Sequence, residues 1–315
     1  MAELISKATR ESFGEVLAEL GEQYEKIIVF DADLSGSTKT SVFAKRFPER
    51  FFDCGIAEGN MMSIAAGAAA AGLIPVASTF AMFAAGRAFE QVRNSIGYAH
   101  LNVKICATHA GLSVGEDGAT HQCNEDIATM RVIPGMTVIC PADDIETKAA
   151  VRAAVEYEGP VYLRFGRMAQ PGIYEAENYS FTIGKGIKLT EGNDVTIIAT
   201  GLMVSRALQA ADLLKEKGIE ARVLDFHTIK PIDTELVEKA AKETGAIVTA
   251  EEHSIIGGLG SAVAEAVGET YPVPVVKVGV NDRFGESGPA KEILEKYGLT
   301  AESIVKAAEK AISMK

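Results

Sequence analysis

The densest group of chemically active side chains lies in one segment, residues 107–122. It holds two of the five histidines, His109 and His121, with the acids Glu116 and Asp117 and three glycines. It follows an apolar run, and ligands of open α/β sheets bind beyond the carboxyl ends of strands. A catalytic or binding loop, a metal site of His109, Asp117 and His121, and a surface loop with hydrogen-bonding histidines all fit this spacing. The spacing alone leaves all three open.

A second candidate is Glu58, which precedes an uncharged, Ala-rich stretch that runs from Gly59 to Gly86. A carboxylate at the start of a helix is favoured by the helix dipole, so simple capping explains it. The alternative is a partly buried carboxyl whose protonation is tuned by apolar surroundings. Phe80 and Phe83 follow, three residues apart. Such a pair usually packs in a core, but it can also stack on a flat heterocycle.

A glycine cluster at residues 257–262 could cradle a phosphate, but such a cluster alone is weak evidence. It follows Glu251, Glu252 and His253 and opens a helix, so we interpret it mainly as close packing of a strand against a helix. We expect His227 and His253 to be structural.

The elements that must position these residues alternate between apolar β-branched runs and helical patterns, which indicates parallel α/β sheets. The first half predicts strands at 26–30, 50–53, 73–77, 103–108, 137–140 and 160–165. Helices are predicted at about 58–71, at 87–96 and at 145–157. A turn-rich, polar segment then interrupts the rhythm, and a second alternation begins near residue 194. We therefore predict one domain over 1–172, a linker over 173–189 and a second domain over 190–315.

Composition narrows the function. The 315 residues carry 43 acidic and 31 basic side chains, a formal net charge of −12, which disfavours a nucleic-acid binder. The scattered cysteines (Cys54, Cys106, Cys123 and Cys140) predict reduced, mostly buried thiols in a cytoplasmic protein. Residues 1–13 are charged and predict an amphipathic helix rather than a signal peptide. The stretch Gly59–Gly86 is too rich in Ala and Gly for a membrane span, and Pro75 interrupts it.

Several of these segments, in this order, resemble the thiamine-diphosphate enzymes of the transketolase family. Gly55-Ile-Ala-Glu58 resembles the family's glutamate motif, and Gly115-Glu-Asp-Gly-Ala-Thr-His-Gln122 its histidine loop. Ala32-Asp-Leu34, Ser78-Thr-Phe80 and Phe284-Gly-Glu-Ser-Gly288 also fall in family order. The resemblance implies two consecutive three-layer α/β/α domains with mostly parallel sheets: a pyrimidine-binding domain and a transketolase C-terminal-like domain.

The resemblance also implies roles at the cofactor. Glu58 would bind N1′ of the aminopyrimidine ring and favour the imino tautomer, which generates the reactive carbanion of thiamine diphosphate. Phe83 would stack on that ring with support from Phe80, and Asp33 would lie near the cofactor at a subunit interface. His121, with Glu58, would be catalytic, and Asp117 and His121 would contact substrate hydroxyls.

Four further positions match the family's grip on a substrate phosphate: Arg10, Ser37, His109 and Arg167. Arginine suits that role because its planar fork pairs with two phosphate oxygens. Taken without the resemblance, Arg10 would be a helix-surface charge and Arg167 part of a strand-end salt bridge.

The family's Gly-Asp-Gly motif, which marks the domain that binds the diphosphate and a divalent metal, is not found in this sequence. The resemblance therefore implies the C-terminal subunit of a split transketolase. An N-terminal partner subunit, in an α2β2 complex, would hold the diphosphate and Mg²⁺ or Ca²⁺, and this chain would hold no metal. The reaction would move a two-carbon ketol unit between sugar phosphates, from a common pentose phosphate or a rarer sugar.

The sequence also departs from the family pattern. Gly86 replaces an aromatic residue of the pyrimidine pocket, Ala119 replaces a proline of the histidine loop, and Ala57 and Gly59 flank Glu58 where Arg and His are frequent. The Gly86 departure, with Arg87-Ala-Phe-Glu-Gln91, is similar to deoxyxylulose-phosphate synthases and to β subunits of 2-oxo-acid dehydrogenases. A subunit of either kind, or a non-catalytic assembly subunit, remains an alternative.

Overall fold

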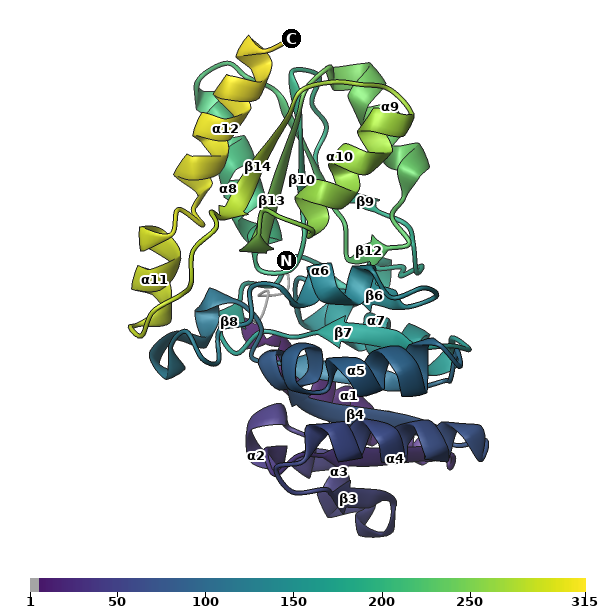
Figure 1. Cartoon of the computed structure of the whole chain (residues 1–315). Coiled ribbons are helices and arrows are strands. Elements are labelled where there is room, and N and C mark those ends of the chain that lie inside the picture. The colour runs from purple at the N-terminus through teal and green to yellow at the C-terminus, as the bar shows by residue number, and fades with distance from the viewer. Residues whose placement is uncertain (1–5) are drawn as a thin grey trace.

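The computed structural model describes residues 6–315, which form two α/β domains stacked one above the other (Figure 1). The lower domain is built on a seven-stranded sheet and the upper domain on a five-stranded sheet. Within residues 6–315, no helix is both long enough and apolar enough to cross a membrane. Together with the helices on their faces, the sheets confirm the predicted α/β class with mostly parallel strands.

The seven-stranded sheet is parallel except at one edge. In spatial order its strands are β12 (Thr228–Lys230), β6 (Thr137–Ile139), β7 (Val161–Arg164), β5 (Lys104–Thr108), β4 (Ile74–Phe80), β2 (Ile27–Asp31) and β3 (Phe51–Asp53). The antiparallel strand is β12. The central strands are buried almost throughout because helices cover both faces, and this explains their largely apolar sequences.

Helices on the two faces of this sheet separate two cores. One face carries α1 (Thr9–Gln23), α3 (Ser41–Arg46) and α7 (Asp144–Glu156). The other carries α4 (Glu58–Ala70), α5 (Phe89–Gln91) and α6 (Asp126–Arg131). The short helix α2 (Ser35–Thr38) follows β2. Alanines of α4 are packed against β4, so the uncharged stretch is the wall of a core and not a membrane segment.

The upper sheet is the frame of the second domain. Its strands, in spatial order, are β14 (Val275–Val280), β13 (Ile247–Ser254), β10 (Val195–Ala199), β11 (Ala221–Asp225) and β9 (Ile187–Lys188). Helices α8 (Met203–Glu216) and α12 (Ala301–Ser313) cover one face. Helices α9 (Thr234–Thr244) and α10 (Leu259–Glu269) cover the other, and α11 (Ala290–Lys296) lies at its end.

Two local predictions need correction. Lys7–Ala8 form a strand, β1, paired with β8 (Ala169–Gln170), so the predicted N-terminal helix starts only at Thr9; residues 1–5 lie outside the described part. The predicted helix at 87–96 is mainly two π-helical turns, Phe83–Arg87 and Val92–Gly97, on either side of α5. One strand was not predicted: β12, which belongs to the second half of the chain, pairs with β6 at the edge of the first sheet. This pairing links the two domains.

Candidate active site

The predicted site residues gather where parallel strands end. Phe80 ends β4, His109 follows β5, Asp33 follows β2, and Glu58 begins α4 one short loop after β3. Because parallel strands share one carboxyl edge, residues far apart in sequence meet there. Asp53 fastens two of these loops together: its Oδ1 accepts hydrogen bonds from the backbone N–H groups of Asp33 (3.1 Å) and Gly55 (2.8 Å).

Glu58 is buried, with 1% of its surface exposed, and its carboxylate is bound by a residue that sequence reasoning had not placed there. Arg87 Nη1 donates to both carboxylate oxygens, each at 2.9 Å. The same guanidinium lies over the Phe83 ring, 4.4 Å from its centroid. One signal could have revealed Arg87: it is the first charged residue after the uncharged stretch and stands four residues, about one helical turn, after Phe83.

Aromatic rings continue the site as a strip. Phe83 and Phe80 are stacked with centroids 5.9 Å apart, and Phe80 is stacked on the His109 ring at 3.8 Å. The His121 ring meets Phe83 edge-on at 5.4 Å. The strip thus joins Glu58 at one end to His109 at the other and carries His121 along it. This arrangement suits a flat heterocycle at one end and a polar ligand along its length.

At the far end of the strip, Arg10 and His109 form a hydrogen-bonded pair. Arg10 Nη1 lies 3.1 Å from His109 Nε2 and 3.0 Å from the Ser37 carbonyl oxygen. Arginine can only donate, so Nε2 accepts and Nδ1 carries the proton, which it donates to Thr108 Oγ1 at 2.9 Å. Burial, with the nearby charges of Arg10 and Arg167, lowers the pKa of His109 to about 3. His109 is therefore neutral at physiological pH.

The remaining predicted residues border this strip. Arg167 pairs with Glu116 at 2.9 Å and donates to the Val114 carbonyl, so it is fastened to the histidine loop. Asp117 is exposed on that loop, and Asp33 is exposed in a left-handed backbone conformation (φ 61°). His121 Nδ1 lies 2.9 Å from Thr120 Oγ1. Arg10, His109 and the Ser37 carbonyl thus meet directly, Arg167 lies within electrostatic reach, and Asp117 and Asp33 stand at the rim.

The second domain holds the histidine loop in place. Gln122 Nε2 donates to the carbonyl of Glu286 (2.9 Å) and to those of Leu112 and Gly115 within the loop. The buried Glu252 Oε1, on β13, accepts from the Ser113 N–H at 2.5 Å, and burial raises the pKa of this carboxyl. A Cβ at Gly285 would lie 1.8 Å from Gln122 Oε1, so a larger residue here would displace the Gln122 side chain from its bonds to the loop.

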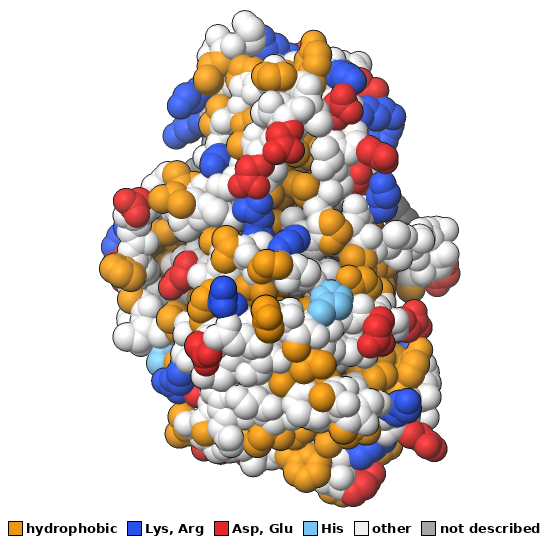
Figure 2. Space-filling view, turned by 45° about the vertical axis from the view of Figure 1, so that its right-hand side comes forward, with side chains coloured by type: hydrophobic (Ala, Val, Ile, Leu, Met, Phe, Trp, Pro, Cys, Tyr) orange, Lys and Arg blue, Asp and Glu red, His pale blue; other side chains and the backbone are white. Residues whose placement is uncertain are grey.

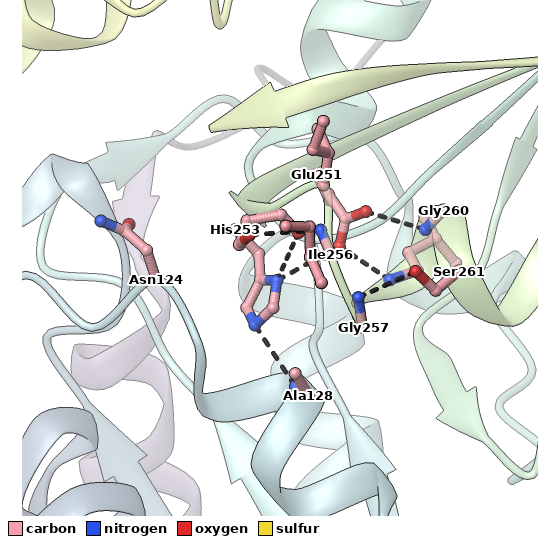
Figure 3. Close-up of polar contacts among 12 residues, drawn as sticks. Asn124, Ala128, Glu251, His253, Ile256, Gly257, Gly260 and Ser261 are labelled. Carbon is pink, nitrogen blue, oxygen red and sulfur yellow. Dashed lines mark hydrogen bonds and ion pairs between the residues drawn. The ribbon is translucent and has the colours of Figure 1, made fainter. Parts of the chain in front are cut away.

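The glycine cluster of the second domain serves packing. The Glu251 carboxylate accepts from the N–H groups of Leu259 (2.7 Å) and Gly260 (2.8 Å) at the start of α10 (Figure 3). A Cβ on Gly258 would lie 2.0 Å from Glu251 Oε2. The N–H groups that could cradle a phosphate are thus already bound, which supports the packing interpretation. His253 Nε2 accepts from the Ala128 N–H at 3.3 Å and so links α6 to β13.

No group of three or more His, Cys, Asp or Glu side chains in residues 6–315 is arranged to hold a metal ion. Within residues 6–315, nothing in the arrangement of His109, Asp117 and His121 supports the metal interpretation. A cavity of about 500 Å³ adjoins the strip at the junction of the domains; Met82, Thr120, Gln122 and Phe284 are among its lining residues. The face shown in Figure 2 mixes apolar, acidic and basic side chains and presents no extended basic patch.

Comparisons with known proteins match both domains of the chain. Residues 6–171 match the family described as "Transketolase, pyrimidine binding domain", and residues 184–304 match "Transketolase, C-terminal domain". A "Putative transketolase C-terminal section" from Methanocaldococcus jannaschii is 54% identical over 96% of this chain and 95% of its own length. A 6-deoxy-6-sulfo-D-fructose transketolase subunit from Clostridium sp. is 46% identical over 97% of this chain and 95% of its own length.

A solved structure is similar over the same extent. It is described as "Split gene transketolase, inactive beta4 tetramer", is 59% identical, and superposes with a TM-score of 0.92 over 98% of this chain and 99% of that chain. Both domains, their order and their fold thus agree with one family. The chain belongs to the transketolase family of thiamine-diphosphate-dependent transferases.

Proposed function

We propose that this chain is the pyrimidine-binding subunit of a two-chain transketolase. The complex would transfer a two-carbon ketol unit reversibly from a ketose phosphate to an aldose phosphate. The observation that carries this proposal is the buried Glu58 carboxylate beside the Phe83 ring, at one end of a strip whose other end is the bonded pair of His109 and Arg10.

The residues at Glu58 fit the aminopyrimidine ring of thiamine diphosphate. The Arg87 guanidinium, a planar group with N–H donors, already touches the Glu58 carboxylate and the Phe83 ring at once. An aminopyrimidine is likewise planar and nitrogen-rich. The pocket is therefore shaped and charged for a group of that kind. Gly86 has no side chain and therefore forms no wall of the pocket. A Cβ at this position would lie 2.6 Å from the Met82 methyl group.

In the proposed complex, Glu58 holds a proton at N1′ of the ring, and its burial keeps water from competing for that hydrogen bond. Phe83 stacks on the ring and Phe80 supports Phe83 from behind. Asp33 stands at the rim, where a second subunit would approach. When bound, thiamine diphosphate supplies a nucleophilic carbon that breaks and forms carbon–carbon bonds next to a carbonyl. All other contributions come from the protein.

The substrate would lie along the rest of the strip. His121, half-buried beside Phe83, is placed to bind sugar hydroxyls and to move a proton at the reacting oxygen, with Asp117 binding a further hydroxyl. Arg10 and Arg167 supply the positive charge for a terminal anion, and the Ser37 backbone orients Arg10. His109, being neutral and bonded to Arg10, contributes as an orienting hydrogen-bond partner rather than as a cation.

The partner in this proposal is an N-terminal chain that carries the Gly-Asp-Gly motif and binds the diphosphate with Mg²⁺ or Ca²⁺, in an α2β2 complex. Two relatives of nearly the same length support it, because they are named as a "C-terminal section" and as a "subunit". The four free cysteines, three of them buried, support a reducing compartment, and we propose the cytoplasm.

The test is reconstitution. The chain is purified alone and together with the product of a neighbouring reading frame that contains Gly-Asp-Gly, and two-carbon transfer is assayed with thiamine diphosphate and Mg²⁺. We expect activity only from the pair, and a loss of at least about 100-fold in kcat for Glu58→Gln, in line with the typical contribution of acid–base catalysis. Glu49→Gln, at an exposed carboxyl, is the matched control.

Three results would contradict the proposal. Full activity of the lone chain would exclude the two-subunit assignment. Unchanged activity of the Glu58→Gln complex would favour a non-catalytic assembly subunit. Turnover of pyruvate in place of a ketose phosphate would favour a deoxyxylulose-phosphate-synthase-like or 2-oxo-acid dehydrogenase subunit. Because the Clostridium relative is named for a sulfofructose, donors that end in a sulfonate are compared with donors that end in a phosphate.

A further inference from the structure

We propose that Arg87 guards the cofactor pocket: it occupies the Glu58 carboxylate and the Phe83 face, and it must swing out before an aminopyrimidine ring can enter. This inference rests on the proposed role of Glu58. The two contacts that define the guard are the paired bonds from Arg87 Nη1 to both Glu58 oxygens, at 2.9 Å, and the stack on Phe83, at 4.4 Å.

Burial shows which partner can move. The Glu58 side chain is 1% exposed, whereas the Arg87 side chain is 49% exposed. Glu58 is fixed at the first turn of α4, while the guanidinium lies at the end of a long side chain at the surface. Arg87 can therefore leave into water at the cost of its two contacts, whereas Glu58 cannot leave its place in the helix.

Competition follows from the geometry. Both carboxylate oxygens accept from Arg87, and one planar group covers the exposed side of Phe83. A ring that binds N1′ to Glu58 and stacks on Phe83 would need the same two surfaces. The ion pair and the ring complex are thus mutually exclusive, and the energy of the ion pair is subtracted from the affinity for the ring.

The test uses the chain alone and the fragment 4-amino-5-hydroxymethyl-2-methylpyrimidine, which lacks the diphosphate and so needs no partner subunit. Its Kd is measured by ligand-observed NMR. For Arg87→Met, which keeps the apolar stem but removes the donors, we expect the Kd to fall about tenfold, as for loss of one charge-assisted contact that is partly solvent-screened. Arg93→Met removes an exposed arginine of the next turn and should leave the Kd unchanged.

Salt gives a second signature, since a half-exposed ion pair is screened by ions. Raising KCl from about 0.05 to 0.5 M should tighten fragment binding to the wild-type chain and to Arg87→Lys, but leave Arg87→Met unchanged. Equal or weaker binding by Arg87→Met, or no binding by that variant, would overturn the guard role. Glu58→Gln in the Arg87→Met background separates the two ideas: if the double variant binds the fragment as well as Arg87→Met does, the assignment of Glu58 itself has failed.

Discussion

A cluster of buried carboxyl groups joins the two domains and should make stability depend on pH. Asp225, at the end of β11, accepts a hydrogen bond from the Tyr174 hydroxyl at 2.7 Å through Oδ2. Glu146, on α7, accepts from the Tyr179 hydroxyl (2.6 Å) and the Ala142 N–H (2.7 Å). Asp225 Oδ1 has no donor among the described residues. The two carboxyls interact with each other, so they are best satisfied when they share one proton.

The sign of the effect follows from the direction of the pKa shifts. Desolvation by burial raises the pKa of Asp225 from 3.8 to about 7. It also raises the pKa of Glu146 well above its ordinary value. The like charge of Asp143 adds to both shifts. When the pKa of a carboxyl is higher in the folded chain than in the unfolded chain, its contribution to stability is fully present below the unfolded-state pKa. That contribution is lost as the pH rises through the folded-state pKa. At pH 5 the Asp225 carboxyl is already ionised in the unfolded chain but still protonated in the folded chain. As the pH rises to 8, the folded chain must ionise this buried carboxyl, and its stability falls. We expect this to cost about 3 kcal/mol.

Asp225→Asn should remove that cost. The asparagine keeps an oxygen for the Tyr174 hydroxyl, and its amide N–H replaces the shared proton toward Glu146. Urea unfolding followed by far-ultraviolet circular dichroism suits this chain, which contains no tryptophan. We expect the stability advantage of Asp225→Asn over wild type to grow by about 3 kcal/mol between pH 5 and pH 8.

The control for that experiment is Asp212→Asn, at an exposed carboxyl of α8, which should follow wild type at both pH values. If Asp225→Asn destabilises the chain equally at pH 5 and pH 8, the two carboxyls do not share a proton and the reasoning is wrong. A wild-type stability that does not decline relative to Asp225→Asn over this range would refute it as well.

Two further predictions concern the support of the histidine loop. Gly285→Ala should cost about 1–3 kcal/mol in urea unfolding, because the new Cβ would collide with the Gln122 side chain, whereas Gly36→Ala, where nothing lies within 4 Å, should be neutral; equal effects would argue against the collision. Glu252→Ala should speed hydrogen exchange at the Ser113 amide, which loses its acceptor, while Glu252→Gln keeps an oxygen there and should change it little; identical exchange in the two variants would contradict this role.

Much of the fold follows from the sequence because its signals are strong. The apolar runs at 26–30, 73–77 and 103–108 are buried on both faces and appear as strands β2, β4 and β5. Strand β12 could not be predicted in its sheet, since three residues carry little local signal and its partner, β6, lies about 90 residues earlier in the chain. The π-helical turns at 83–97 escaped for a similar reason: their residues have an ordinary helical pattern.

Sequence motifs could predict which residues gather at the candidate site, but not which of them bind one another. The motifs identified Glu58, Phe83, His109 and His121, and strand order brings these residues to one edge. No local pattern says that Arg87 would bind Glu58, because the two residues are 29 positions apart and meet only when α4 packs beside the turn after β4. The neutral state of His109 likewise depends on Arg10 and on burial, which are properties of the folded chain.

The contacts of the histidine loop also explain why the second domain accompanies the first. Glycines give this loop the left-handed conformations that it needs at 111, 115 and 118, but they leave it little rigidity of its own. Arg167 of the first domain fastens it on one side, and the second domain adds further bonds through Glu252 and the 284–288 segment. In the proposed function, the contribution of the second domain is to position this loop. If His121 contacts the substrate as proposed, this support orders its side chain when the chain folds rather than at each encounter with a substrate.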